Sequence, residues 1–379
     1  MGISLKRRAR GEFMKKIMLV FGTRPEAIKM CPLVLELRQR ARLETIVCVT
    51  GQHRQMLDSV LQAFSVIPDY DLSVMGSEQT LFDITHKVMM GMRDVLLDKK
   101  PDVVLVHGDT TTTYATALAS FYLGIPVGHV EAGLRTYNIR SPFPEEFNRQ
   151  AVDIVSDWAF APTEASRDNL LKEGKNPKIV FVTGNTAIDA LKTTVRDDFS
   201  HPELDWASDS RLIMLTAHRR ENLGEPMRRI FRAIRRVVDE FEDLKVIYPV
   251  HLNPAVKQAA EDEIGGHPRI RLIEPLDVLP FHNFLARSYL ILTDSGGIQE
   301  EAPSLGKPVL VLRDTTERPE GVAAGTLKLT GTEEADVYNG FKQLVTNATV
   351  YEAMSKASNP YGDGFASKRI ADILEQSPS

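Results

Sequence analysis

The sequence is poor in cysteine, with only Cys31 and Cys48 among 379 residues. Two cysteines cannot build a disulfide framework or a cysteine-based metal site, so both are excluded. Each cysteine lies in an apolar segment, and we expect both to be buried free thiols in a reducing compartment. The sequence therefore indicates a cytoplasmic protein.

Long apolar runs are also absent. No segment reaches the ~20 apolar residues that a helix needs to cross a bilayer, so we expect no membrane span. Residues 1–13 are basic, but no apolar stretch of signal-peptide length follows them. We interpret residues 1–13 as a disordered extension or a leader fused to the natural protein, with Met14 as its natural start.

Basic residues do not outnumber acidic ones. The chain has 46 Lys and Arg against 51 Asp and Glu, and its net charge is -5. This balance argues against a surface for nucleic acid or for anionic membranes.

Several cofactor and catalytic motifs are missing as well. The sequence has no G-x-G-x-x-G after a strand, no Walker lysine, no H-x-x-x-H pair and no G-x-S-x-G elbow. The run Asp69-Tyr70-Asp71 resembles a D-x-D metal motif, but it lies in a weakly patterned turn. We therefore predict neither a cofactor nor a metal site.

Short β-branched runs alternate with amphipathic segments along the whole chain. Strands are predicted at 16–21, 45–50, 102–107, 127–130, 158–161 and 179–182, and a second series at 211–216, 245–250, 270–273, 289–293 and 308–312. Such alternation is typical of parallel sheets covered by helices on both faces. Residues 196–210 are polar and contain Pro202, and we interpret them as a linker.

These patterns predict an α/β protein with two Rossmann-like, doubly wound parallel-sheet domains and a cleft between them. The predicted domains are 14–195 and 196–364. A last helix spans 365–379, and the pattern alone does not decide which domain it joins.

The stretch 290–302 is the most informative in the chain. An apolar strand ends in Thr-Asp, and Ser295, Gly296 and Gly297 lead into a helix. Ser295 can cap that helix, and the glycines let a ligand approach N–H groups that favour an anion such as a diphosphate. Glu301 in the second turn is suited to hold hydroxyls of the same ligand. An alternative is an ordinary strand–turn–helix junction.

Two cations lie near the start of the predicted helix at 25–40. Arg24 and Lys29 are on the unfavourable side of the helix dipole, which Glu26 offsets in part. Their position indicates an anion nearby, either a bound phosphate or a carboxylate. An alternative is a pair of solvated charges.

Asp109 and Glu131 each follow a short apolar strand. Two carboxylates at neighbouring strand ends suit proton transfer, because a shared environment can separate their pKa values. As an alternative, Asp109 caps the next helix. Glu145 and Glu146 form a third acidic point, where one of the two is only a first-turn carboxylate.

Five motifs together resemble a known family. They are GTRPEAIK at 22–29, HGDT at 107–110, HVEAGLR at 129–135, TAHRREN at 216–222 and TDSGG at 293–297. In this order they look like the bacterial non-hydrolysing UDP-N-acetylglucosamine 2-epimerases, over nearly the whole chain from about residue 15.

The resemblance implies a fold shared with one class of glycosyltransferases, with the last helix packed back on the first domain. It also implies interconversion of UDP-GlcNAc and UDP-ManNAc through elimination of UDP to 2-acetamidoglucal and re-addition, supplying ManNAc for cell-surface polysaccharide. A homodimer is expected from the same resemblance.

The site residues implied by the resemblance fall into two groups. The catalytic positions match Asp109, Glu131, Glu145 and His218, with base and acid left unassigned. The positions that hold UDP match Arg24, Lys29, His218, Phe281, Ser295, Gly296, Gly297, Glu301 and Arg318, with Glu301 at the ribose and Phe281 at the uridine.

Gram-positive members of the family also bind UDP-GlcNAc at a second site as an allosteric activator. The matching residues are Gln52, Gln55, Glu145, Arg219 and His251. Glu78 replaces a basic residue of some members, which puts that regulation in doubt, and Leu276 replaces a glutamine near the base.

Three other functions share parts of this pattern. A nucleotide-sugar glycosyltransferase has the same fold and diphosphate site but needs an acceptor. A sugar-nucleotide sensor does not need Asp109 and Glu131 together. A hydrolysing epimerase, which releases ManNAc, is a close variant.

Overall fold

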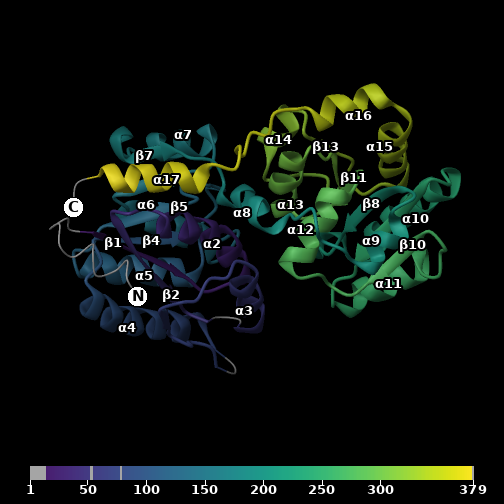
Figure 1. Cartoon of the computed structure of the whole chain (residues 1–379). Coiled ribbons are helices and arrows are strands. Elements are labelled where there is room, and N and C mark those ends of the chain that lie inside the picture. Colours follow the sequence, from purple (N-terminus) through teal and green to yellow (C-terminus); the bar gives the residue numbers. More distant parts are fainter. Residues whose placement is uncertain (1–13, 52–53, 77–78, 378–379) are drawn as a thin grey trace. The chain divides into compact units, whose positions relative to one another are not determined.

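The computed structural model describes residues 14–51, 54–76 and 79–377. The chain divides into two compact units (Figure 1). Unit 1 comprises the described residues up to Ala190 together with the segment from Gly364 onward, and unit 2 is Leu191–Asp363. In the part of the chain that is described, no helix is long and apolar enough to cross a membrane.

Unit 1 is built on a seven-stranded parallel sheet in the order β3-β2-β1-β4-β5-β6-β7. Its strands are β1 Lys15–Phe21, β2 Leu43–Val49, β3 Tyr70–Asp71, β4 Val103–His107, β5 Val127–Val130, β6 Trp158–Ala161 and β7 Val180–Val182. The strands follow the chain outward from β1 to β3 on one side and from β4 to β7 on the other, so the strand order reverses between β1 and β4. Ligands of open α/β sheets bind beyond the carboxyl ends of the strands at such a switch point.

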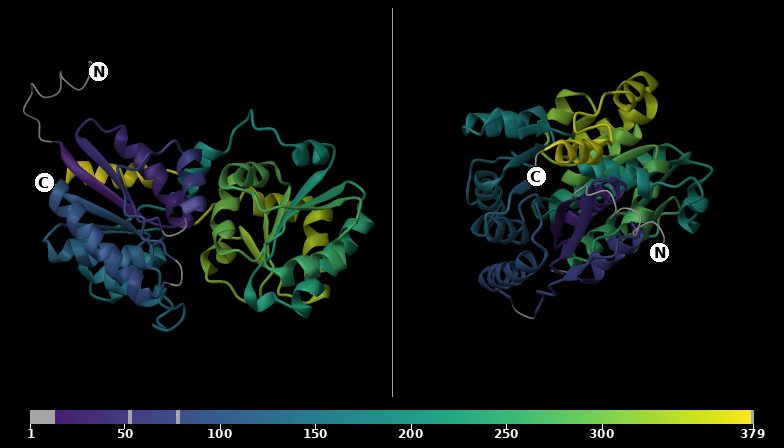
Figure 2. Two further views of the ribbon diagram at one scale, coloured as in Figure 1. Left: turned by 90° about the horizontal axis from the view of Figure 1, so that it is seen from below. Right: turned by 60° about the vertical axis from the view of Figure 1, so that its left-hand side comes forward.

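Helices cover both faces of this sheet (Figures 1 and 2). They are α2 Arg24–Arg38, α3 Arg54–Ala63, α4 Leu81–Lys99, α5 Thr111–Tyr122, α6 Glu145–Val155, α7 Glu164–Lys172, α8 Thr186–Thr194 and α17 Ala366–Gln376. The central strands are buried on both sides, and every residue of β4 is buried. This explains why they read as continuous apolar runs rather than alternating ones.

The last helix, α17, belongs to unit 1 and packs against α2. The Asp189 carboxylate accepts hydrogen bonds from two backbone N–H groups at its start, at 3.2 and 2.7 Å. At its other end the buried Lys15 ammonium donates to the carbonyls of Leu374 and Ser377, both at 3.2 Å. An anion at the start and a cation at the end of a helix both stabilise its dipole.

Unit 2 has a six-stranded parallel sheet in the order β10-β9-β8-β11-β12-β13. The strands are β8 Arg211–Thr216, β9 Leu244–Pro249, β10 Ile270–Ile273, β11 Leu290–Thr293, β12 Val309–Val311 and β13 Leu327–Leu329. Its helices are α9 Pro202–Ala207, α10 Glu225–Glu240, α11 Pro254–Ile264, α12 Val278–Arg287, α13 Gly296–Glu301, α14 Pro319–Ala323, α15 Glu334–Thr346 and α16 Ala348–Ser355.

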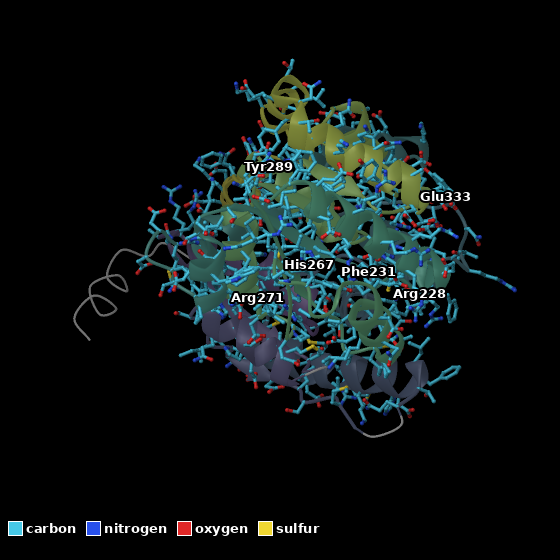
Figure 3. The ribbon with its side chains drawn as sticks, turned by 90° about the vertical axis from the view of Figure 1, so that its right-hand side faces the viewer. Arg228, Phe231, His267, Arg271, Tyr289 and Glu333 are labelled. Carbon is cyan, nitrogen blue, oxygen red and sulfur yellow. The ribbon has the colours of Figure 1, made fainter. Side chains whose placement is uncertain are left out.

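Helix α10 shows how the pattern of unit 2 produces its packing. Its apolar residues recur every three to four positions, and Phe231 and Ile234 are fully buried in the core. The opposite face carries arginines such as Arg228, whose guanidinium lies 2.6 Å from Asp262 and 3.1 Å from Glu263 (Figure 3). Opposite charges therefore cover this face of the unit.

Two doubly wound parallel-sheet units confirm the predicted fold class, whereas the cleft between them stays a prediction. The linker predicted at 196–210 is wrong, because this segment contains α9, whose Leu204 is buried and whose Trp206 packs on the core. The short strands β3 and β13 were not predicted, since two or three residues are too few to show a period.

Candidate active site

Glu131 lies directly after β5, at the carboxyl edge of the unit 1 sheet. Its backbone has φ 67°, a left-handed conformation that is uncommon for a residue with a side chain. The carboxylate forms an ion pair with Lys29 from α2 and accepts a hydrogen bond from Asn185 at 3.3 Å. Nε2 of His107, at the end of β4, is 3.6 Å away. Three separate segments therefore converge on this carboxylate.

These neighbours determine the charge of Glu131. Burial by itself raises the pKa of the Glu131 carboxyl, but Lys29 and His107 outweigh burial and hold that pKa well below its usual range. The low pKa favours the ionised form of Glu131. The anion near Lys29 is therefore the Glu131 carboxylate.

Asp109 follows β4, the strand next to β5, so it lies at the same edge of the sheet. Its carboxylate forms an ion pair with Arg149 of α6, and its carbonyl accepts from the Asn148 amide at 2.9 Å. The alternative that Asp109 caps the next helix is wrong, because Thr110 is the N-cap of α5. Asp109 is thus held by α6 through its side chain and its backbone.

The sequence did not predict the buried polar network beneath these two carboxylates. The imidazole of His129 lies between the Gly108 carbonyl, 2.7 Å from Nε2, and the Asp153 carboxylate, 2.6 Å from Nδ1. Asp153 also accepts from Arg135 at 2.7 Å. The network joins the segments that carry Asp109 and Glu131.

Glu26 explains how the start of α2 is fixed. Its carboxylate accepts from the Gly22 and Thr23 N–H groups at 3.1 and 2.7 Å, completing a capping box with the Thr23 side chain. It also accepts from the Thr110 hydroxyl at 2.7 Å. Glu26 therefore ties the loop with Arg24 to the loop with Asp109.

The two neighbouring glutamates of α6 have different surroundings. Glu146 is fully buried and accepts from the Thr136 and Tyr137 N–H groups at 3.1 and 3.0 Å. It is therefore the structural carboxylate of the pair. The side chain of Glu145 is half-buried and has no hydrogen bond or ion pair to any described residue.

In unit 2, the loop after β8 is organised around Asp294. Oδ2 of this fully buried side chain accepts from the His218 and Arg219 N–H groups at 2.9 and 2.8 Å and from the Asn222 amide at 3.1 Å. Oδ1 has no hydrogen-bond partner among the described atoms and faces His218 Nδ1 at 3.6 Å. Asp294 thus fixes the backbone that presents His218.

The His218 ring stacks on His251, with centroids 5.3 Å apart and 12° between the planes. Burial lowers the pKa of His218, and His251 and Arg219 lower it further against the opposing effect of Asp294. A neutral ring in this position can gain a proton when an anion binds beside it. Arg219 and His251, both predicted for a second site, therefore adjoin His218.

The Ser295-Gly296-Gly297 turn begins α13. Ser295 occupies the N-cap position, but its side chain makes no capping bond to the described backbone. A Cβ on Gly296 would lie 3.1 Å from Arg318 Cζ, so the guanidinium covers this residue closely. Arg318 is oriented by Glu300, 2.8 Å from its Nε. A cation is therefore held directly over the first turn of α13.

Glu301 lies beside α12, the helix that carries Phe281. Glu301 Oε2 is 3.6 Å from Nε2 of His282, whose other ring nitrogen is 2.7 Å from the Thr194 hydroxyl. Phe281 and Leu276 are partly buried against the same core cluster that contains Ile298 of α13. A Cβ on Gly297 would lie 3.9 Å from the Glu301 carboxylate, so this acid is close to the glycine turn.

Some predicted residues have no description. Gln52 and Glu78 lie outside the described residues, as does the side chain of Gln55. In the described parts, no group of three or more His, Cys, Asp or Glu side chains is placed to hold a metal ion. Of the second site, Arg219 and His251 come together in unit 2, while Glu145 belongs to unit 1.

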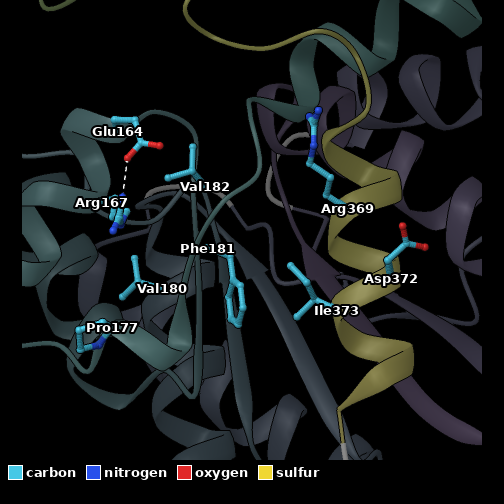
Figure 4. A pocket seen from close by; sticks show the side chains of 9 residues that line it. All are labelled: Glu164, Arg167, Pro177, Val180, Phe181, Val182, Arg369, Asp372 and Ile373. Atoms are coloured by element: carbon cyan, nitrogen blue, oxygen red, sulfur yellow. Dashed lines mark hydrogen bonds and ion pairs between the residues drawn. The ribbon is translucent and has the colours of Figure 1, made fainter.

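A cavity of about 500 Å³ lies elsewhere in unit 1, over edge strand β7 between α7 and α17 (Figure 4). Phe181 and Ile373 line its floor, and Arg369 lies at its α17 side. The cavity contains none of the predicted site residues and is not on the strand ends that carry Asp109 and Glu131.

Sequence reasoning missed several site residues that the fold brings in. Arg149, Asn185 and His107 contact the two carboxylates of unit 1, and Asp294 fixes the His218 loop. His107 and Asp294 lie inside motifs at strand ends, and this position in the sequence could have identified them as site residues. Arg149 and Asn185 carry no such signal, because their partners are far away in the chain.

Comparison with known proteins identifies relatives of the whole chain. The family model described as UDP-N-acetylglucosamine 2-epimerase matches residues 35–375. The UDP-N-acetylglucosamine 2-epimerase of Bacillus subtilis is 63% identical over 359 residues, covering 95% of this chain and 94% of the relative.

Two solved structures have the same fold. One from Listeria monocytogenes is 56% identical, with a TM-score of 0.92 and 95% of each chain covered. The Neisseria meningitidis UDP-GlcNAc 2-epimerase bound to UDP-GlcNAc is 49% identical, with a TM-score of 0.85 and coverage of 96% of this chain and 100% of that one. The chain therefore belongs to the UDP-N-acetylglucosamine 2-epimerase family of isomerases.

Proposed function

We propose that this protein interconverts UDP-GlcNAc and UDP-ManNAc by epimerisation at C2, without releasing free sugar. The observation that carries the proposal is the pair Asp109 and Glu131, which follow adjacent strands and are each paired with a separate cation. Relatives with the epimerase name, one of them bound to UDP-GlcNAc, support the same reaction.

The chemistry requires two proton-transfer groups. The C2 proton is too weakly acidic for simple removal and return, so one carboxylate removes it while the C1–O bond to UDP breaks. This step gives 2-acetamidoglucal and retained UDP. UDP then adds back at C1, and a proton is delivered to C2 from the opposite face. Because the low pKa of Glu131 favours its ionised form, this carboxylate is suited to accept a proton first.

The retained UDP is assigned to the turn at Gly296 and Gly297. Arg318 lies over that turn, and the Ser295 side chain does not cap the first N–H groups of α13, which point toward the N-terminal end of the helix where a diphosphate is favoured. Cations and N–H groups aimed at the leaving diphosphate stabilise its developing charge. Arg24, Lys29, His218 and Ser295 complete the diphosphate site, with Glu301 at the ribose and Phe281 at the uracil ring.

Incubation of the pure protein with UDP-GlcNAc alone in D2O tests this proposal. Epimerisation through a solvent-exchanging acid gives UDP-ManNAc with deuterium at C2, seen by NMR and mass spectrometry. Free ManNAc and UDP would indicate the hydrolysing variant instead. Absence of any product until an acceptor is added would favour a glycosyltransferase, and binding without turnover would favour a sensor.

The two carboxylates are tested separately. Asp109→Asn and Glu131→Gln are each expected to lower kcat by on the order of 10²-fold or more, as for lost acid–base groups. UDP binding, measured by calorimetry, should persist in both. Near-normal turnover in both variants would remove these residues from the mechanism.

We further propose that UDP-GlcNAc activates the enzyme at a second site that includes Gln52, Gln55, Glu145, Arg219 and His251. The contact of His251 with His218 supports it, because a ligand on one ring then affects the other. A sigmoidal dependence of rate on UDP-GlcNAc should become hyperbolic in Gln52→Ala. A hyperbolic rate dependence in the wild-type protein would indicate that the second site no longer regulates the enzyme.

We propose a cytoplasmic homodimer that supplies ManNAc units for cell-surface polysaccharide. The surface formed by α5 and α6 supports the dimer, because Tyr122 and Ile154 are 68% and 77% exposed there. Ile154→Asp should yield a monomer in light scattering. Ile67→Asp is the matched control, since Ile67 is 78% exposed but outside α5 and α6. If Ile154→Asp stays a dimer, or if Ile67→Asp also becomes a monomer, the interface is not the surface formed by α5 and α6.

A further inference from the structure

The imidazole of His129 is fully buried in β5 between two hydrogen-bond acceptors. Nε2 lies 2.7 Å from the Gly108 carbonyl and Nδ1 lies 2.6 Å from Asp153 Oδ1. A carbonyl only accepts hydrogen bonds, so Nε2 must carry a proton and donate it to the Gly108 carbonyl. Nδ1 forms the second hydrogen bond, with Asp153.

Asp153 is ionised for reasons that extend beyond His129. Burial raises the pKa of the Asp153 carboxyl, but the charges and hydrogen bonds of His129 and Arg135 outweigh burial and lower it. Oδ2 accepts from Arg135 at 2.7 Å and from the Gly133 N–H at 3.3 Å. Arg135 also pairs with Glu173 at 2.7 Å, so the buried charges are balanced.

The hydrogen bond to Gly108 matters because Asp109 is the next residue in the chain. The Gly108 N–H donates to the Val130 carbonyl at 2.9 Å, while the Gly108 carbonyl accepts from His129. Strand β5 thus holds both backbone polar groups of Gly108, the residue before Asp109. Glu131 lies two residues after His129 on the same strand end.

We propose that His129 is a positioning residue for the epimerisation, an inference that rests on the function proposed above. Through its Nε2 hydrogen bond it ties the Gly108 carbonyl to β5 and so fixes where Asp109 lies relative to Glu131. It touches neither substrate nor reacting atoms. Its effect is therefore on the rate of proton transfer and not on the binding of UDP.

Two substitutions separate its two hydrogen bonds. In His129→Gln the amide nitrogen takes the place of Nε2 and keeps a donor toward Gly108. In His129→Asn the amide nitrogen takes the place of Nδ1 and keeps only the donor toward Asp153. We expect kcat to fall by roughly 10²-fold in His129→Asn, as for a catalytic group displaced by about 1 Å, and by much less in His129→Gln. KM and UDP affinity should remain unchanged in both.

The matched control is His267→Asn, which breaks a histidine–aspartate pair in unit 2, where His267 Nε2 lies 3.0 Å from Asp239 (Figure 3). It should leave kcat unchanged. Equal kcat values in the two His129 variants, or a loss that appears in KM, would overturn the positioning role. A wild-type protein that forms no UDP-ManNAc in D2O would instead refute the proposed function.

A second measurement does not depend on the variants folding. In protein labelled with 15N-histidine, His129 should show a proton on Nε2, in a signal protected from solvent exchange. The signal is assigned by its absence from His129→Gln or by through-bond correlation in the wild type. A ring without a proton on Nε2 would contradict the hydrogen bond to Gly108 and with it the proposal.

Discussion

Replacing Lys29 with methionine is the sharpest test of the charge balance around Glu131. The two side chains form an ion pair in which Lys29 is 17% and Glu131 13% exposed. Methionine keeps most of the volume of the lysine stem but removes its charge. The Glu131 carboxylate then keeps only His107 and Asn185 as partners, at 3.6 and 3.3 Å.

The expected loss follows from the burial of the pair. Removing one partner of a buried ion pair typically costs on the order of 3–5 kcal/mol, because the remaining charge is uncompensated. The loss also depends on pH. In the wild type the low pKa of Glu131 contributes stability that is present above its unfolded pKa of about 4.3 and is lost only as pH falls toward the folded value.

Lys29→Met removes the Lys29 charge and hydrogen bond that lower the pKa of Glu131, and we expect burial to outweigh the remaining effect of His107 and to raise that pKa above its unfolded value. The variant therefore loses stability as pH rises from about 4.3 through that raised pKa, because the buried carboxyl must ionise. The stability gap between wild type and Lys29→Met should be larger at pH 8 than at pH 5. The double variant Lys29→Met/Glu131→Gln contains neither charge. The difference in stability between the wild type and this double variant should therefore no longer depend on pH.

The two tryptophans allow each unit to be followed by itself. Trp158 lies in unit 1 and Trp206 in unit 2, and the chain has no other. In a Trp206→Phe background, urea unfolding followed by fluorescence reports unit 1. A gap of equal size at pH 5 and pH 8, or a larger gap at pH 5, would refute the reasoning.

Three further predictions concern single positions. Gly296→Ala should weaken UDP binding in calorimetry, because its Cβ would lie 3.1 Å from Arg318. In Gly297→Ala the Cβ would meet its nearest neighbour at 3.9 Å, so this variant should keep the fold intact. Unchanged UDP affinity in both variants would show that the diphosphate does not bind at this turn. Arg149→Met should lower kcat while UDP still binds, since Asp109 loses its ion-pair partner, and an unaltered kcat would separate Arg149 from the mechanism. Lys15→Met should destabilise unit 1 by about 1–3 kcal/mol in urea unfolding, because two carbonyls at the end of α17 lose a charged hydrogen-bond donor. An unchanged urea midpoint of unfolding would contradict this prediction.

The sequence predicted the long elements well because their period depends on local physics. Strand β4 is buried on both faces and reads as an apolar run, and α10 alternates apolar and charged residues with the period of a helix. Helix α9 was missed because six residues show no period, and its Trp206 packs on the core only in the folded unit.

The candidate site was predictable as a set of strand ends but not as a set of contacts. Motifs placed Asp109 and Glu131 at one edge of the sheet, since parallel strands end together. Their cations could not be paired from sequence, because Arg149 follows Asp109 by 40 positions and Lys29 precedes Glu131 by 102. The left-handed backbone of Glu131 was also hidden, since such a conformation is expected of glycine and not of glutamate.

The attachment of α17 has a consequence for how the protein is made. Unit 2 is one continuous segment, whereas unit 1 is completed only by the residues from Gly364 onward. A ribosome synthesises all of unit 2 before it makes α17, and domains generally fold as units during synthesis. Lys15 meets its carbonyl partners only once Leu374 and Ser377 have been made. The unit that carries Asp109 and Glu131 is therefore closed only after the whole of unit 2 has been synthesised, by the helix that follows unit 2 in the chain.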